Sequence, residues 1–333
     1  MTDNLIENLK SRYFDTMAQK NLMTRSVALL DFPNHANVGD SAIWLGELAL
    51  LRSLGVRSVV YTCDLLTYSR DHLAKRIGKN GIILLHGGGN FGDVWPRHQY
   101  FREKVIEEFP NHEIVMLSQS FHFHSEDELA RAASVINDHK HISILLRDKY
   151  SMELAQTQFQ CPLYLVPDAA FLIDDIPNRS AAQSDIIFLA RTDKEAGLRD
   201  IPAADGLNVL VTDWLDEDRG VLIRMSDILS RQLVLRPYLS LILRPLVSST
   251  YNCMARLRFE RGCRLLCSGR VLITDRLHAH ILSLLLGIEH IFMDNNYGKN
   301  RRFYDTWTHS SHLAHWADSP VHAFEIARQL LRS

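Results

Sequence analysis

The sequence lacks several features that would assign it to a specialised class of protein. Its 333 residues carry a formal net charge of −2, which does not suggest the broad basic field of a nucleic-acid-binding protein. The five cysteines are odd in number and scattered, which favours free thiols in a reducing compartment. The polar N-terminus has no apolar core of a signal peptide. We therefore expect a cytoplasmic protein that has no nucleic-acid partner and binds anions only locally.

The chain does contain many apolar segments, and these alternate between strand-like and helix-like patterns. Hydrophobic residues make up 46% of the sequence, which is enough to build packed cores. Strands are expected at residues 26–31, 58–62, 81–85, 113–117, 141–146, 163–166, 185–190 and 207–212, and around Val271 and Ile291. This alternation favours mainly parallel sheets covered by helices.

A polar segment at residues 173–184 contains a proline and small residues, as linkers commonly do. We therefore predict an α/β fold of two Rossmann-like domains, residues 1–175 and 176–333, which face each other across a cleft. In open α/β sheets, ligands bind beyond the carboxyl ends of the strands. Functional residues are expected at those strand ends.

Three glycines directly follow one predicted strand. At Gly87, Gly88 and Gly89, backbone N–H groups can approach a ligand that any Cβ atom would block, and Asn90 adds a polar side chain. The run matches neither the dinucleotide fingerprint nor a P-loop. The alternative is a tight turn that needs positive φ angles.

A second polar cluster lies between the first strand and the helix that follows it. Asn37, Gly39 and Asp40 occupy this position. Asp40 either caps the helix or presents a carboxylate to the cleft as a base.

A third cluster lies between the strand at Val271 and an apolar helix. The free N–H groups at such a helix start favour an anion, and Arg276 and His278 are well placed to bind one. In the alternative interpretation, Asp275 caps the helix and the two cationic side chains are merely solvated.

Together these clusters resemble the polysaccharide pyruvyl transferase family. The shared motifs are Asn37-x-Gly39-Asp40, His86-Gly87-Gly88-Gly89-Asn90, Arg147-Asp148 followed by Ser151, Pro167-Asp168, Arg276-Leu277-His278-Ala279-His280 and Tyr297-Gly298-Lys299. The amino-acid sequence at residues 118–123 and 294–307 is most similar to that of the bacterial exopolysaccharide branch of the family. The resemblance implies a GT-B-like pair of domains. It also implies transfer of a pyruvyl group from phosphoenolpyruvate to a sugar, with release of phosphate and formation of a ketal.

The candidate residues suit this chemistry. Phosphoenolpyruvate carries a phosphate and a carboxylate, so its site needs several cations. The expected donor-binding residues are Arg147, Arg276, Lys299, Gly88, Gly89 and Asn90.

We expect His278 to protonate the methylene carbon and Asp40 to accept the proton of the acceptor hydroxyl. The expected acceptor-binding residues are Asn37, His86 and His122. Thus residues 1–175 would form the acceptor side and residues 176–333 would carry the donor motif. No step of the reaction requires a metal or a redox cofactor.

Residues 222–247 mix apolar side chains with Arg224, Arg231, Arg236 and Arg244. The longest uncharged run here is far shorter than the ~20 residues that span a bilayer. The segment is therefore not expected to cross a membrane. As a basic amphipathic segment it is expected to lie against the inner membrane face, where the resemblance implies that the acceptor is often a lipid-linked oligosaccharide. The alternative is a core helix whose arginines lie on its solvent-exposed edge.

Two other functions remain open at this point. A GT-B-type glycosyltransferase would use a nucleotide sugar in a similar two-domain cleft. A non-catalytic subunit of a polysaccharide assembly complex would keep the fold without the activity. The sequence does not indicate an oligomeric state.

Overall fold

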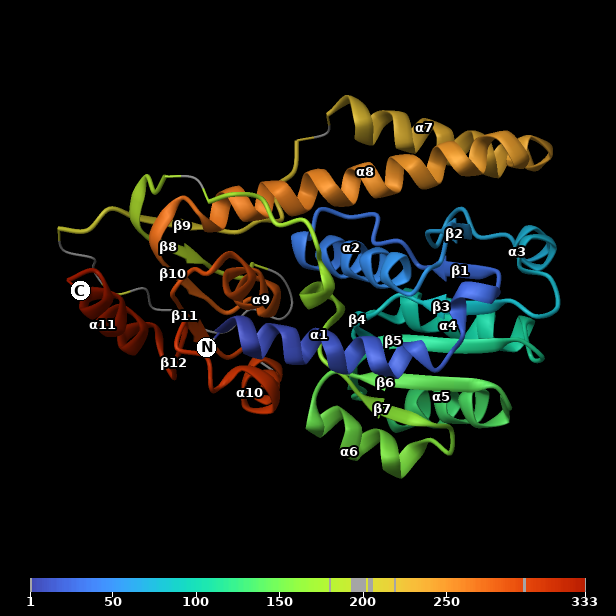
Figure 1. Ribbon diagram of the computed structural model, residues 1–333, viewed down its shortest axis with the longest axis horizontal. Coiled ribbons are helices and arrows are strands. Elements are labelled where there is room, and N and C mark those ends of the chain that lie inside the picture. The colour runs from blue at the N-terminus through green and yellow to red at the C-terminus, as the bar shows by residue number, and fades with distance from the viewer. Residues whose placement is uncertain are drawn as a thin grey trace.

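The computed structural model describes residues 2–179, 181–192, 202, 206–218, 220–295 and 298–332. It contains two parallel β-sheets with helices packed against them (Figure 1). The mixed α/β class and the parallel sheets predicted from the sequence are confirmed. The boundary at residue 175 and the cleft between two domains stay predictions.

The first sheet has the strand order β2-β1-β3-β5-β6-β7, and β4 also pairs with β5. Its strands are β1 (Val27–Leu30), β2 (Val59–Cys63), β3 (Ile82–Leu85), β4 (Gly88–Gly92), β5 (Glu113–His122), β6 (Ile142–Leu146) and β7 (Leu163–Leu165). Strands β1, β3 and β6 are apolar and wholly buried, as expected when helices cover both faces of a parallel sheet.

Gly88 and Gly89 of the glycine run after β3 belong to strand β4, and not to the tight turn of the alternative interpretation. Gly88 and Gly92 have φ angles of 119° and 143°, which few other residues adopt. A Cβ atom on Gly92 would lie 1.6 Å from the carbonyl oxygen of His122. Glycine therefore allows this short strand to lie directly against β5, which extends beyond its predicted end to His122.

The helices around this sheet are α1 (Thr2–Ala18), α2 (Val38–Ser53), α3 (Arg70–Ile77), α4 (Pro96–Glu108), α5 (Glu126–Asp138) and α6 (Lys149–Gln158), with short 3-10 helices η1 (Leu22–Thr24) and η2 (Ala169–Leu172). Asn37 caps α2, since its Oδ1 accepts the N–H of Gly39 at 3.1 Å. Asp40 lies in the first turn of α2, so the interpretation of Asp40 as the cap is wrong.

The second sheet has the order β12-β11-β10-β8-β9. Its strands are β8 (Ser184–Leu189), β9 (Val209–Thr212), β10 (Gly269–Thr274), β11 (His290–Met293) and β12 (Ala314–Ala317), and its helices are α9 (Leu277–Leu286), α10 (Lys299–Phe303) and α11 (Pro320–Leu330), with a π-helical turn, η4 (Tyr304–Thr308). Arg276 is the N-cap residue of α9, whereas Asp275 accepts the N–H of Arg191 at 2.9 Å. Asp275 is therefore not the predicted cap.

The two sheets share a hydrophobic cluster. Val38 and Ala42 of α2 pack in the same cluster as Leu272 of β10 and Leu282 of α9. Helix α1 contributes Leu9 to this cluster, while its Tyr13 packs in the core of the first sheet. This packing brings the N-termini of α2 and α9 to one region of the molecule.

A helical hairpin lies over α2, at the top of Figure 1. It consists of α7 (Val221–Leu235), η3 (Pro237–Leu239) and α8 (Ser240–Leu266). Its inner side is buried: Tyr251 stacks on Phe32 with ring centroids 4.2 Å apart, and Leu233 joins the same core. Among the described residues, no helix combines the length and the apolar character needed to span a membrane.

Candidate functional site

A cavity of about 350 Å³ lies beyond the ends of β1 and β3, beside the first turns of α2 and α9. Residues from both sheets line it, including Asp31, His35, Asn37, Asp40, His86, Gly89, Asn90, Trp95, His98, Arg147, Arg191, His278 and Lys299. Eight of the predicted site residues are in this set. This is the position at which α/β sheets commonly bind ligands.

A buried carboxylate connects the two most important predicted residues. Arg147 Nη1 donates to Asp168 Oδ2 at 2.5 Å, and His278 Nε2 lies 3.3 Å from the same oxygen. Arg147 and Asp168 have no significant exposure. Asp168 therefore fixes the positions of a guanidinium from the first sheet and an imidazole from the second.

The charge of this carboxylate is maintained by its neighbours. Burial alone would raise the pKa of Asp168, but the charge and hydrogen bond of His278 and the charge of Arg147 lower it well below its usual value. Asp168 is consequently an anion at neutral pH. It can orient the imidazole of His278 and stabilise its protonated form.

Two cationic side chains converge above Gly89. A Cβ atom built on Gly89 would lie 2.5 Å from Lys299 Nζ and 3.2 Å from Arg147 Nη2. Arg147 uses Nε for Ser120 and Nη1 for Asp168, while its buried Nη2 has no hydrogen-bond partner. A buried guanidinium N–H without a hydrogen-bond partner lowers the stability of the fold, unless a bound ligand accepts its hydrogen bond. The arrangement is suited to a small anion.

Asp40, in the first turn of α2, lines the same cavity as Gly89. Asn37 Nδ2 donates to Asp40 Oδ2 at 2.8 Å, and His35 Nε2 lies 3.5 Å from the same oxygen. Burial would raise the pKa of Asp40, but the charges of His35, His278, His86 and Lys299 lower it. Asp40 is therefore an ionised carboxylate that can accept a hydrogen bond from a bound hydroxyl.

Close backbone approach joins α2 to His278. A Cβ atom on Gly39 would lie 2.2 Å from His278 Nδ1, so a side chain at this position would displace the imidazole. This contact explains why the sequence has glycine between Asn37 and Asp40. It also places His278 beside the N-terminus of α2.

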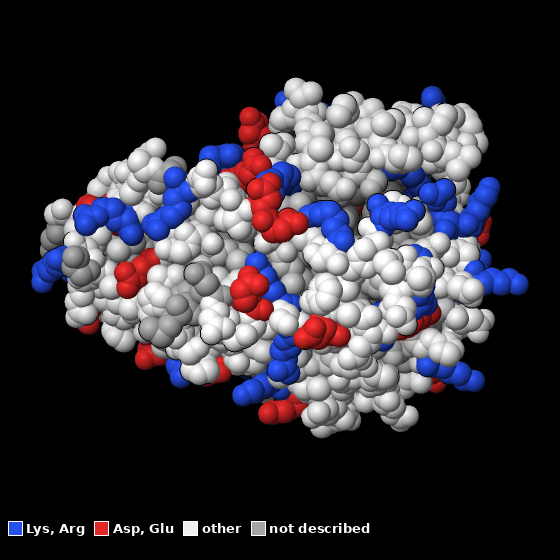
Figure 2. Space-filling model, viewed as in Figure 1, with Lys and Arg blue, Asp and Glu red and all other residues white. Residues whose placement is uncertain are grey.

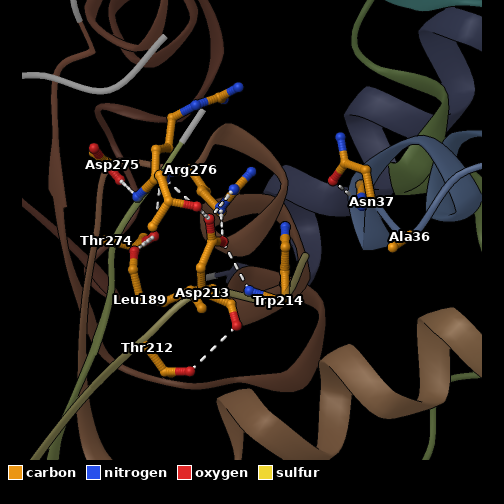
Figure 3. A network of polar contacts seen from close by, with 12 residues as sticks. Ala36, Asn37, Leu189, Thr212, Asp213, Trp214, Thr274, Asp275 and Arg276 are labelled. Atoms are coloured by element: carbon orange, nitrogen blue, oxygen red, sulfur yellow. Dashed lines mark hydrogen bonds and ion pairs between the residues drawn. The ribbon is translucent and has the colours of Figure 1, made fainter. Parts of the chain in front are cut away.

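Arg276 does not line the cavity, although the sequence predicted it to bind the donor. Its Nε and Nη2 donate to the two carboxylate oxygens of Asp213, both at 2.6 Å, and its guanidinium lies 5.5 Å from the ring centroid of Trp214. Figure 3 shows Arg276 and Asp213 pointing toward each other, with Asn37 on a separate element. Its role in donor binding stays a prediction.

Two further predicted residues lie just outside the main cavity. His122 lines a small adjacent pocket together with Lys299 and Ser120, and its Nε2 lies 3.2 Å from His124 Nε2. Gly88 lines neither of these two pockets, and a Cβ atom built on it would lie 3.3 Å from Ile43 Cδ1 and 3.7 Å from Asp40 Oδ1. The structure therefore separates His122 from the predicted acceptor residues Asn37 and His86. Tyr297, part of the last motif, lies outside the described residues.

Several lining residues were not predicted as site residues. Arg191 follows β8 and Asp31 follows β1, so the strand-end rule could have identified both. Asp168 also follows a strand, within the Pro-Asp motif. Glu47 could not have been found in this way, because it lies in the middle of α2 and reaches His86 only through the packing of the helix on the sheet.

The comparisons with known proteins agree with this geometry. The sequence profile of the polysaccharide pyruvyl transferase family matches residues 37–297. "Pyruvyl transferase 1" of Schizosaccharomyces pombe is 34% identical over 307 residues, which cover 87% of this chain and 71% of that protein. "Putative pyruvyl transferase EpsO" of Bacillus subtilis is 33% identical over 288 residues, which cover 83% of this chain and 84% of that protein. The chain belongs to the polysaccharide pyruvyl transferase family.

The protein is therefore a transferase, and the interpretation as a non-catalytic assembly subunit is set aside. A crystal structure of a functionally uncharacterised protein from Klebsiella pneumoniae superposes with a TM-score of 0.60. It covers 94% of this chain and 99% of its own at 18% identity, so the similarity concerns the fold alone.

Proposed function

We propose that the protein transfers a pyruvyl group from phosphoenolpyruvate to a sugar of an exopolysaccharide or of its lipid-linked precursor. One observation carries this proposal: the unpartnered Nη2 of Arg147 lies beside Lys299 Nζ above Gly89, while Asp168 holds His278 on the other side of Arg147. An anion bound at Arg147 would place its reacting carbon close to the imidazole.

The donor fits this set of charges. Its phosphate and carboxylate would take the N–H groups of Arg147 and Lys299, and Arg191 is a third cationic residue that lines the cavity. Asn90 and the exposed backbone around Gly89 would add hydrogen bonds. We also propose that Arg276, which pairs with Asp213, contributes to donor binding.

The proposed reaction starts with proton transfer. Protonated His278 gives its proton to the methylene carbon, so the central carbon becomes electrophilic. A sugar hydroxyl attacks that carbon as its proton passes to Asp40, the C–O bond to phosphate breaks, and a second hydroxyl closes the ketal. Asp40 then passes the first hydroxyl proton to the departing phosphate, and the proton of the second hydroxyl restores His278. The chemistry needs neither a metal nor a redox cofactor.

The acceptor would enter from the side of Asn37 and His86. In this proposal, residues 1–175 and 176–333 act as two Rossmann-like domains in a GT-B-like arrangement, and the cavity is the cleft between them. The acceptor is attached to a lipid carrier at the inner face of the membrane, and residues 222–247 contact that membrane from the cytoplasm.

The test is direct. Purified protein is incubated with phosphoenolpyruvate and a panel of synthetic and lipid-linked glycosides, and both released phosphate and the mass of the glycoside are followed. Stoichiometric phosphate release with addition of one pyruvyl ketal is the expected result. Transfer of a sugar from a nucleotide sugar in parallel reactions, without turnover of phosphoenolpyruvate, would instead establish the glycosyltransferase alternative.

A further inference from the structure

A second cavity, of about 330 Å³, lies beneath the start of α8 and shares no lining residue with the cavity of the proposed active site. It is bounded by β2, α3 and the first two turns of α8. The polar lining residues are Ser58, Tyr61, Thr62, His72, Arg76, Ser240, Arg244 and Ser248, and no acidic residue is among the lining residues that the structure describes. The cavity is therefore cationic and rich in hydroxyl groups.

Arg244 is the central residue of this cavity. Its guanidinium lies 4.4 Å from the ring centroid of Tyr61, and its Nη2 donates to the carbonyl oxygen of Thr67 at 3.1 Å. Its Nε and Nη1 are buried and have no hydrogen-bond partner. Charged oxygens of a phosphate or carboxylate bound in the cavity would accept from these unpartnered N–H groups.

The neighbouring groups would complete an anion site. His72 Nε2 lies 2.9 Å from Ser240 Oγ, and Arg76 donates from Nε to the carbonyl of Val60 at 3.1 Å, which leaves its remaining N–H groups near the cavity. Burial and the charges of Arg244 and Lys75 lower the pKa of His72, although Asp71 opposes this shift. A bound anion would offset this concentration of positive charge.

The cavity adjoins an exposed apolar surface, which we name the hairpin tip. It consists of the exposed side chains of Val234, Leu235, Tyr238, Leu241, Ile242 and Leu246. Leu235, Tyr238 and Leu241 are 74%, 77% and 67% exposed, values that are unusual for large apolar side chains gathered in one place. Leu241 also lines the cavity, so the apolar surface and the cationic cavity are continuous.

The charged side chains that the hairpin itself carries around its tip have one sign. The sequence has no Asp or Glu between Asp227 and Glu260, whereas Arg231 and Arg236 are exposed beside the tip. In Figure 2 the hairpin at the top of the molecule is mostly white, with blue side chains along its lower edge. An apolar surface bordered by arginines matches the acyl boundary and the anionic headgroups of a membrane.

We propose that the Arg244 cavity binds the phosphate of an anionic membrane lipid whose acyl chains cover the hairpin tip. A free phosphate would fill the cavity but leave the tip in water, so the exposed apolar surface favours a lipid. The inference deepens the proposed membrane contact of residues 222–247. It does not depend on the pyruvyl transfer itself, which uses another cavity.

The test is vesicle flotation of the full chain. Vesicles of phosphatidylcholine alone are compared with vesicles that also contain phosphatidylglycerol. We expect the wild type to float with the anionic vesicles, and Arg244→Gln to weaken this binding roughly tenfold or more, because hydrogen bonds to a charged group are lost. The double variant Leu241→Ser with Ile242→Ser should also lose binding.

Arg264→Gln is the matched control. It removes an arginine from the same helix, but its side chain is 65% exposed and 3.9 Å from Glu260. Its binding should stay within about twofold of wild type, because surface ion pairs contribute little. Equal vesicle binding by Arg244→Gln and Arg264→Gln would overturn the proposal.

Two further measurements separate the remaining outcomes. Thermal stabilisation by inorganic phosphate that depends on Arg244, without any vesicle binding, would show a site for a free anion and would contradict the lipid assignment. Pyruvyl transfer to a short soluble acceptor should be unchanged in Arg244→Gln, which shows that the variant is folded. If that variant does not fold, His72→Gln with Arg76→Gln replaces it, and retained vesicle binding by this double variant would likewise contradict the proposal.

Discussion

His86 Nδ1 lies 2.7 Å from Glu47 Oε2, and the two side chains are 2% and 0% exposed. The other oxygen of Glu47 accepts the N–H of Gly87 at 2.8 Å, so the carboxylate fixes both the imidazole and the start of the glycine run. Because Nδ1 is occupied, the unpartnered Nε2 of His86 is the atom available at the cavity that His86 lines. The cavity therefore contains a second imidazole with a fixed orientation, in addition to that of His278, and it lies on the proposed acceptor side.

Replacing Glu47 should change the titration of His86. Burial tends to lower the pKa of His86, but the charge and hydrogen bond of Glu47, with Asp31 and Asp40, raise it above its ordinary value of 6.5. In Glu47→Gln the opposing charge of Glu47 is lost, so NMR titration should give a lower pKa for His86. An unchanged pKa would show that Asp31 and Asp40 dominate.

The same variant should be less stable in a pH-dependent way. A histidine with a raised pKa stabilises the folded state fully below its ordinary pKa, and this stabilisation is lost as pH rises through the folded pKa. Glu47→Gln should therefore lose about 1–3 kcal/mol of unfolding free energy near pH 6 and less at pH 9. Denaturant unfolding at the two pH values measures this, with the exposed Glu107→Gln as control.

Gly89→Ala should weaken donor binding without unfolding the protein. The added Cβ would lie 2.5 Å from Lys299 Nζ, and the flexible end of the lysine can move away from it. The ammonium then leaves the anion site, so KM for phosphoenolpyruvate should rise roughly tenfold. Gly220→Ala is the control, because nothing lies within 4 Å of its Cβ position. Equal KM values in the two variants would remove Lys299 from the proposed site.

Asp168→Asn should affect both stability and catalysis. It leaves Arg147 buried without its anionic partner, and loss of one member of a buried pair costs about 3–5 kcal/mol. Because the pKa of Asp168 is lowered from 3.8, its stabilisation is present above that pH and is lost as pH falls. The wild type should thus lose stability on acidification more steeply than the variant. Parallel acid-unfolding curves would contradict the assigned charge.

Much of the sheet structure could be predicted from the sequence, because buried parallel strands are continuous apolar runs. Strands β1, β3, β6 and β8 lie within one or two residues of the predicted ranges. Strand β4 could not be predicted, since Gly88–Gly92 has no strand pattern and pairs only because glycine permits contact with β5. Strand β12 is short and half-buried, which gives it little hydrophobic signal.

The site was predictable to the extent that its residues follow strands. Asp40, His86, Arg147, His278 and Lys299 meet in one cavity, as expected of strand ends. Arg276 follows a strand as well, yet it pairs with Asp213, whose position depends on the pairing of β9 with β8. Such long-range partners leave no pattern in the local sequence.

The hairpin shows the same limit of local patterns. Residues 222–247 were expected either to face a membrane or to form a core helix, and the structure shows that some of their apolar side chains are buried and others exposed, while membrane contact stays a prediction. Leu233 and Val247 are buried in the core of the first sheet, whereas Leu235 and Leu241 are exposed. Pro237 ends α7, but Pro245 lies inside α8. Only the structure separates the inner side of the hairpin from its tip.

His278→Gln tests the proposed acid. Positioned proton transfer contributes about 10² to 10⁴ in rate, so kcat should fall by that factor while unfolding remains cooperative. His322→Gln on the exposed side of α11 is the control and should keep wild-type turnover. Near-normal turnover in His278→Gln would exclude this histidine from the mechanism.

Arginine-to-lysine exchanges test the two predicted donor arginines, because charge is kept while the fork of N–H groups is lost. Arg147→Lys should weaken donor binding roughly tenfold, since Nη2 supplies the hydrogen bond that the structure leaves open.

Arg276→Lys should lower both donor affinity and stability, because its two bonds to Asp213 become one. Asp213→Asn separates these effects: it weakens the same pair but keeps the guanidinium. Isothermal titration with phosphoenolpyruvate and denaturant unfolding measure both quantities. If Arg276→Lys binds the donor normally and only its stability falls, Arg276 is a structural residue, and Arg147 with Lys299 alone forms the anion site.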